Sequence, residues 1–494
     1  MFDRKFGIIL PVFSLPSRYG IGSLGQKAFD FIDYLYSSRV GLWQVLPLGP
    51  TSYGNSPYQS FSAFAGNDYF IDLELLISDG LLKKEDINKF EDKDESDRID
   101  YGKLYLYRFD ILDKAARNFF KHVPADYFSF IENNKKWIND YALFMALKKQ
   151  FDMIPWLQWP EQYRQKDKNT IDQFLLDNKE LIDHFCFCQY EFYKQWTAVR
   201  QYANRKKVKI IGDIPFYVSL DSADVWANKQ LFMLDATGSP TEVAGVPPDY
   251  FSETGQLWGN PIYAWSTRKK EVYEWWGDRV SISNKLFDYL RIDHFRGFDS
   301  YWAVPAESDT AINGKWKKGP GIDFIKYIKK ASGNMKLIAE DLGLLTPSVR
   351  KMLRESRLPG MKVLEFAFSD DETNEYLPDQ YPVNCVCYTG THDNEPLSAW
   401  FDSLDKQSRS FFIKYMTKKR LNPDIDGIIR LGMSSKAKMF IVQMQDLLGT
   451  GNDSRINSPG VEEGNWQWRV SFTLLDDTLK QRIQFLTSKY NRRT

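Results

Sequence analysis

The chain has 494 residues, and its 65 lysines and arginines equal its 65 aspartates and glutamates, so the formal net charge is zero. A neutral balance argues against the basic stripe of nucleic-acid-binding proteins and against a polybasic membrane surface. No segment approaches the roughly 18 uninterrupted apolar residues of a membrane span, and Pro11 closes the first apolar run before it reaches signal-peptide length. We expect a cytoplasmic protein with no nucleic acid and no membrane among its partners.

The cysteines and the aromatic residues give further compositional signals. The four cysteines form two pairs, Cys186/Cys188 and Cys385/Cys387, about 200 residues apart. Two such pairs could hold zinc, but this separation is not zinc-finger spacing, so we expect buried thiols, no disulfide and no metal. Aromatic residues make up 16% of the chain, including 15 Trp. Their flat faces suit the apolar C–H faces of sugar rings.

Short apolar runs alternate with helical patterns along the chain, which favours βα units and a parallel sheet. The runs are nearly continuous, as expected for strands that are covered on both faces. They occupy residues 7–10, 42–46, 208–214, 289–293, 336–340, 363–368, 385–389 and 466–470. Eight such strands predict a (β/α)8 TIM barrel, with residues 1–494 forming a single catalytic unit.

Helices and insertions are predicted between these strands. One apolar stripe joins Ala28, Phe31, Ile32 and Leu35, and a second joins Ala437, Phe440, Ile441, Met444 and Leu448; both have helical spacing. Residues 70–205 are too many for a single crossover, so we expect a mainly helical subdomain there. Residues 221–285 contain a loop rich in proline, glycine and aromatic residues, and we expect this second insertion to cover the active-site face.

Four acidic residues end apolar runs. They are Asp213, Asp293, Glu340 and Asp393. One acid after a strand is usually an N-cap for the next helix. In a barrel, however, the active site is built at the carboxyl ends of the strands, and four acids placed in this way predict a catalytic centre.

Glycosidic cleavage needs two carboxyl groups in different protonation states. Arg291 and Asp293 lie two apart on a strand and face the same side, so the guanidinium should keep Asp293 ionised, as a nucleophile requires. Glu340 has only Asp341 as a charged sequence neighbour, which suits the acid/base role. Asp393 and His392 could hold the hydroxyls of the same sugar. His294 fits a core residue and a site residue equally well.

The motifs around these acids resemble glycoside hydrolase family 77, the 4-α-glucanotransferases or amylomaltases of the α-amylase clan. The resemblance rests on RIDHFRG at 291–297, IAEDLG at 338–343 and TGTHDN at 389–394. It continues through residues 42–50, 56–67, 212–215, 256–261 and 465–466, in order along nearly the whole chain. Two departures are Glu395-Pro396, where the family often has Asp-Thr, and Asp68, where a proline is usual.

The resemblance implies a retaining 4-α-glucanotransferase that needs no metal and no organic cofactor. Asp293 would form the covalent glucosyl intermediate, Glu340 would be the acid/base, and Asp393 would stabilise the transition state. Substrate binding is assigned to Tyr58, Asp213, Asp249, Trp258, Arg291, His392 and Asn465. The expected partners are α-1,4-glucans and maltooligosaccharides, as both donor and acceptor.

Two alternatives stay open at the level of sequence. An α-amylase-type hydrolase would share the glycosyl-enzyme intermediate, and a non-catalytic glucan-binding protein would keep only the binding surface. Transfer requires an oriented acceptor and partial exclusion of water. The loops at 245–251 and 451–465 would serve this purpose if they project over the cleft. No pattern indicates the oligomeric state.

Overall fold

The computed structural model describes residues 4–52, 54–91, 97–248, 252–343, 345–369, 371–461 and 463–492. Its centre is an eight-stranded parallel sheet in the order β10–β11–β12–β1–β2–β3–β6–β9. These strands are β1 (Lys5–Ile9), β2 (Leu42–Gln44), β3 (Lys209–Ile214), β6 (Tyr289–Ile292), β9 (Lys336–Ala339), β10 (Gly360–Val363), β11 (Cys385–Tyr388) and β12 (Met439–Gln443). The amide of Ala339 donates to the carbonyl of Pro359 at 2.9 Å, which joins the two edge strands. The predicted (β/α)8 barrel is confirmed.

The strands are buried on both faces, as their continuous apolar runs predict. Every residue of β2, β6, β10, β11 and β12 is buried. Helices cover the outside of the sheet, because a parallel strand needs a crossover to return to the same edge. The first of them, α1 (Gln26–Ser37), buries Ala28, Phe31, Ile32 and Leu35, so the predicted stripe is confirmed.

Three sequence predictions for the C-terminal part of the barrel are wrong in whole or in part. Residues 437–448, predicted as one helix, form β12 followed by the short helix α17 (Met444–Leu448). The predicted strand at 466–470 is not a barrel strand; Trp468 forms only an isolated bridge with Arg98. The strand predicted at 363–368 lies earlier, at β10, and continues as a 3-10 turn, Leu364–Phe366.

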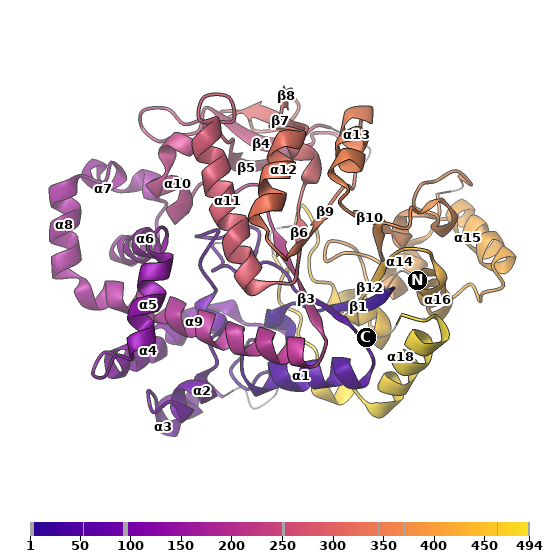
Figure 1. Ribbon diagram of the computed structural model, residues 1–494, viewed down its shortest axis with the longest axis horizontal. Coiled ribbons are helices and arrows are strands. Elements are labelled where there is room, and N and C mark those ends of the chain that lie inside the picture. Colours follow the sequence, from indigo (N-terminus) through magenta and orange to yellow (C-terminus); the bar gives the residue numbers. More distant parts are fainter. Residues whose placement is uncertain are drawn as a thin grey trace.

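Helices dominate the segment between β2 and β3 (Figure 1). They are α2 (Leu73–Ser78), α3 (Lys84–Ile87), α4 (Tyr101–Phe119), α5 (Ala125–Asn134), α6 (Ile138–Gln150), α7 (Glu161–Arg164), α8 (Lys168–Asp177) and α9 (Lys179–Arg205). Most of them extend to one side of the barrel, whereas the long helix α9 leads back to β3. We retain 70–205 as the proposed range of this subdomain.

The second insertion contributes to a small antiparallel sheet, in the order β5–β4–β7–β8. Its strands are β4 (Glu242–Val246), β5 (Gln256–Pro261), β7 (Ser300–Pro305) and β8 (Lys315–Lys318). The helices α10 (Ala223–Ala227) and α11 (Lys269–Leu286) flank this region in sequence. We keep residues 221–285 as the proposed bounds of this second insertion.

The remaining helices follow the later strands. They are α12 (Ile322–Ala331), α13 (Pro347–Ser356), α14 (Leu397–Ser403), α15 (Lys406–Lys418), α16 (Ile425–Ser434) and α18 (Asp477–Lys489). The first and last described segments lie close together, and the guanidinium of Arg492 donates to the carbonyl of Lys5 at 3.3 Å.

Two further observations concern the helices and the cysteines. Within the described ranges, no helix combines the length and the apolar character that crossing a membrane requires. All four cysteines are free thiols in buried positions.

Candidate active site

The four predicted acids lie at the carboxyl ends of barrel strands, and three of them belong to the adjacent strands β3, β6 and β9. Asp213 is the second-last residue of β3, and Asp293 and Glu340 directly follow β6 and β9. Asp393 lies on the segment after β11. Because parallel strands end at the same rim, residues separated by up to 180 positions meet there.

Arg291 joins two of the acids. Its guanidinium donates to Asp213 at 2.9 and 2.7 Å and contacts Asp293 at 2.9 Å. The side chains of Arg291 and Asp213 are 5% and 0% exposed, whereas that of Asp293 is 31% exposed. Asp293 is therefore the member of this group that a substrate can reach, and the Arg291 guanidinium lies against it as a counter-charge.

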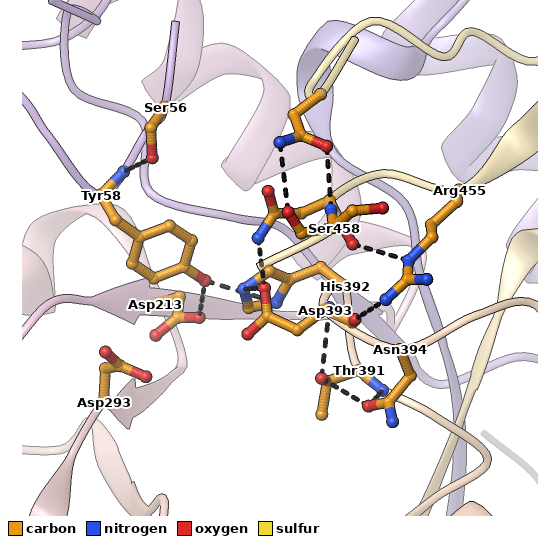
Figure 2. A network of polar contacts seen from close by, with 12 residues as sticks. Ser56, Tyr58, Asp213, Asp293, Thr391, His392, Asp393, Asn394, Arg455 and Ser458 are labelled. Carbon is orange, nitrogen blue, oxygen red and sulfur yellow. Dashed lines mark hydrogen bonds and ion pairs between the residues drawn. The ribbon is translucent and has the colours of Figure 1, made fainter. Parts of the chain in front are cut away.

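Tyr58 connects Asp213 to the segment that carries Asp393 (Figure 2). Its hydroxyl donates to Asp213 at 2.7 Å and lies 3.4 Å from Nδ1 of His392, against whose ring it stacks at 4.9 Å between centroids. The other ring nitrogen of His392 lies 3.4 Å from Asp393. The contacts thus run without a break from Asp293 to Asp393.

Glu340 is held by two backbone amides. The amide of His294 donates to its Oε2 at 2.6 Å, and the amide of Leu342 donates to its Oε1 at 2.8 Å. His294 adopts a left-handed conformation, with φ of 49°, and this turn places its N–H at the carboxyl group. Burial, and then the negative charge of Asp293, raise the pKa of Glu340 to about 7.

His294 and Trp258 form one wall beside these acids. Their rings meet edge to face, with 4.9 Å between centroids, and Trp258 is half-buried. Burial lowers the pKa of His294 to about 4, so its imidazole is neutral at neutral pH. His294 thus has features of both interpretations left open for it, because its half-buried ring packs against Trp258 while its backbone amide donates to Glu340.

Several contacts at Asp393 involve residues that the sequence did not single out. Nδ2 of Asn457 donates to the Asp393 carboxylate at 2.6 Å, and the guanidinium of Arg455 donates to the Asp393 backbone carbonyl at 2.7 Å. Trp466 lies beside Tyr58 and His392, at 5.9 and 6.0 Å between ring centroids. The 451–465 loop therefore packs onto the Asp393 side of the site.

Two assigned substrate-binding residues stand apart from this network. The side chain of Asn465 bonds within its own loop. Its Oδ1 accepts from the backbone amide of Ser458 at 2.8 Å, and its Nδ2 donates to the Val461 carbonyl at 2.7 Å. Its direct role at a sugar stays a prediction. Asp249 lies outside the described residues, as does the end of the 245–251 loop.

A pair of buried acids lies beneath the segment that carries His392 and Asp393. Asp446, which is 2% exposed, accepts from the Thr389 hydroxyl at 2.6 Å and from the Leu397 amide at 2.7 Å. Glu365 lies under Gly390, where an added Cβ would stand 2.5 Å from its Oε1. Asp446 thus holds both ends of the segment, Glu365 packs beneath its start, and neither acid was among the predicted residues.

The geometry supports acid–base and nucleophilic chemistry on a neutral substrate. It combines a reachable carboxylate paired with arginine, a protonatable carboxyl group, and aromatic rings that suit a sugar. The described residues contain no group of three or more His, Cys, Asp or Glu side chains placed to hold a metal ion.

Comparison with known proteins decides the family. The model of glycoside hydrolase family 77, the 4-alpha-glucanotransferases, matches residues 10–475. The chain belongs to the 4-alpha-glucanotransferase family. A 4-alpha-glucanotransferase of Clostridium butyricum is 45% identical over 97% of this chain and 99% of its own length. One from Streptococcus pneumoniae is 41% identical over 100% of this chain and 98% of its own length.

Solved structures agree with this family assignment. An amylomaltase from Streptococcus agalactiae in complex with acarbose matches with a TM-score of 0.96 and 38% identity, covering 99% of this chain and 100% of its own. An amylomaltase from Corynebacterium glutamicum, 16% identical over 98% of this chain and 75% of its own, supports the fold with a TM-score of 0.81. The family resemblance read from the sequence motifs is confirmed.

Proposed function

We propose that this 4-alpha-glucanotransferase moves segments of α-1,4-glucan from a donor to the 4-hydroxyl of an acceptor glucose or maltooligosaccharide. The observation that carries the residue assignment is the contact between Arg291 and Asp293, set beside the half-buried and protonatable Glu340. One acid is paired with a guanidinium and the other can keep a proton, which is the division that a retaining mechanism needs. A cytoplasmic location stays a prediction.

In the first step, a carboxylate oxygen of Asp293 attacks the anomeric carbon of the donor glucose at the cleavage point. The bond from that carbon to the leaving 4-oxygen breaks, and Glu340 gives its proton to this oxygen. The amides of His294 and Leu342 then hold the Glu340 carboxylate that remains. Asp393, at 45% exposure, is open to the sugar hydroxyls and would stabilise the oxocarbenium-like transition state.

In the second step, the acceptor 4-hydroxyl attacks the same carbon, and the bond to Asp293 breaks. The hydroxyl proton passes to Glu340, which restores the starting state, and two inversions preserve the α configuration. The 451–465 loop, which contacts Asp393 through Arg455 and Asn457, supports the proposal that acceptors are held while water is partly excluded.

The product pattern from maltotriose tests this function. Transfer produces glucose together with a ladder of longer oligosaccharides and almost no net gain of reducing ends. A hydrolase of the amylase type would give only shortened products and a steady gain of reducing ends. A non-catalytic glucan-binding protein would leave maltotriose unchanged.

Asp293→Asn tests the role of the nucleophile. We expect a fall in transfer rate of roughly 10³-fold or more, because no covalent intermediate can form. Asp323→Asn is the matched control, since this side chain is 75% exposed and lies on α12, and it should keep full activity. Comparable rates in the two variants would contradict the assignment.

A further inference from the structure

A second cavity lies at the opposite end of the barrel from the carboxylates. It has a volume of about 550 Å³ and is bordered by Lys5, Tyr289 and Lys336, the first residues of β1, β6 and β9. The candidate acids follow the last residues of β6 and β9, so the two sites lie at opposite ends of the same strands. We call this cavity, with its border of Lys5, Lys329, Lys336, Arg357 and Lys438, the basic pocket.

The border of the basic pocket carries five cationic side chains and, among the described residues, no carboxylate. This is unusual in a chain whose charges balance overall. Elsewhere in the chain, Arg350 and Lys362 share Glu375 as a partner. By contrast, within the described ranges, Lys329, Lys336 and Arg357 form no ion pair with a carboxylate. The pocket is therefore a local concentration of positive charge.

Part of this charge has a structural explanation. Lys329 is in the last turn of α12, where a cation is favourable, and its ammonium donates to the Ser356 carbonyl at 2.6 Å. The ammonium of Lys438 donates to the Asn384 side chain at 3.0 Å. These contacts explain the presence of Lys329 and Lys438 without any need for a bound ligand.

Lys336 and Arg357 have no comparable structural role. Both are exposed, and the ammonium of Lys336 lies 5.4 Å from the centre of the Tyr289 ring. Arg357 follows α13 with φ of 57°, a left-handed position for which glycine or asparagine costs less.

The size and charge of the pocket indicate its ligand. A guanidinium binds phosphate oxygens through paired N–H donors, and ammonium groups add charge without fixing direction. The volume is in the range of small-molecule sites and exceeds what an inorganic ion needs. Asn384 and Ser332, also on the border, are polar and uncharged. We propose that the basic pocket binds a small phosphate ester of about the size of a hexose monophosphate, separately from the glucan site.

Isothermal titration at physiological ionic strength tests this proposal. The probes are glucose 1-phosphate, glucose 6-phosphate, pyrophosphate, inorganic phosphate, sulfate and glucose. We expect saturable one-to-one binding of a glucose phosphate, much weaker binding of the inorganic anions, and none of glucose. Affinity for sulfate or inorganic phosphate equal to that for the esters would overturn the proposal, because the site would then hold simple anions only. Preferred binding of pyrophosphate would equally exclude a sugar ester.

A pair of double variants separates the pocket from general surface charge. Lys336→Gln/Arg357→Gln should weaken ester binding by at least about tenfold, because two charge-assisted contacts are lost. The matched control is Lys207→Gln/Arg420→Gln, which removes the same charge from two exposed residues with φ of 61° and 56°. The control should bind normally, and both proteins should keep the thermal midpoint of the parent. Equal weakening in both would refute a built site.

A competition experiment locates the binding. In Asp293→Asn, saturating maltotriose occupies the glucan site without being consumed. The affinity for the phosphate ester should stay the same with and without maltotriose. Displacement by maltotriose would show that the ester binds at the carboxylates, and the proposal would fail while the transferase function stood.

Discussion

Arg291→Met is the perturbation that tests most directly how the site is held together. Arg291 is 5% exposed and makes all its charged contacts with Asp213 and Asp293. Without it, the fully buried carboxylate of Asp213 keeps only the Tyr58 hydroxyl as a hydrogen-bond donor among the described contacts. Removing one partner of a buried ion pair costs about 3–5 kcal/mol. That is a large part of the roughly 5–15 kcal/mol by which proteins are stable.

A double-mutant cycle distinguishes this explanation from simple loss of packing. Asp213→Asn in the Arg291→Met background removes the orphaned charge, so the double variant should be more stable than the sum of the single changes predicts. The assay is equilibrium unfolding in urea at pH 7, followed by tryptophan fluorescence. A loss below about 1 kcal/mol for Arg291→Met would refute the reasoning, since only a surface pair is that weak. Strict additivity in the cycle would refute it as well.

Three other changes have definite expected outcomes. Transfer activity should fall as pH rises through about 7, because Glu340 must be protonated to release the leaving group. Glu340→Gln should abolish the reaction of maltodextrins yet spare the first step with a glycosyl fluoride, and rapid-quench kinetics would measure that step. Burial raises the pKa of Asp446 from 3.8 to about 7, so the folded state holds a proton that the unfolded chain releases and stability falls with pH in that window. In the parent, the free energy of unfolding should therefore be lower at pH 8 than at pH 4 by up to roughly 4 kcal/mol, and Asp446→Asn should remove this difference in urea unfolding. If the variant kept the same dependence of stability on pH, Asp446 would not be its cause. Gly390→Ala should lower the rate constant for transfer about 10²-fold with little change in fold by circular dichroism, because its Cβ would displace the Asp393 segment from Glu365; a fully active variant would contradict that.

The sequence was sufficient for the barrel but not for all of its strands. Residues 437–448 place Phe440, Ile441 and Met444 at helical spacing, yet β12 is formed by the continuous apolar run Met439–Gln443. Periodicity cannot distinguish a short buried strand from a buried helix. The β-branched pair Ile441-Val442 was the signal that could have corrected the prediction.

Asp213, Asp293 and Glu340 could be grouped from the sequence because each ends or directly follows an apolar run, and strand geometry brings such positions together. Asp393 lies on the segment after β11, so its placement also depends on loop contacts.

The residues that support these acids could not be predicted in this way. Asn457 lies in an irregular loop and reaches Asp393 across 64 residues. Glu365 and Asp446 are acids at positions that a pattern treats as solvent-facing, and only packing reveals that they are enclosed. Contacts between distant loops depend on tertiary geometry that no local pattern encodes.

The two amides that hold Glu340 have an evolutionary consequence. A backbone N–H is present in every residue except proline, so substitutions at His294 or Leu342 can change the surrounding side chains without deleting either donor. The orientation of Glu340, the proposed proton donor, is thus set by the path of the main chain. Substitutions near Glu340 can change its pKa through neighbouring charges and burial, whereas its orientation stays the same as long as the backbone keeps its path.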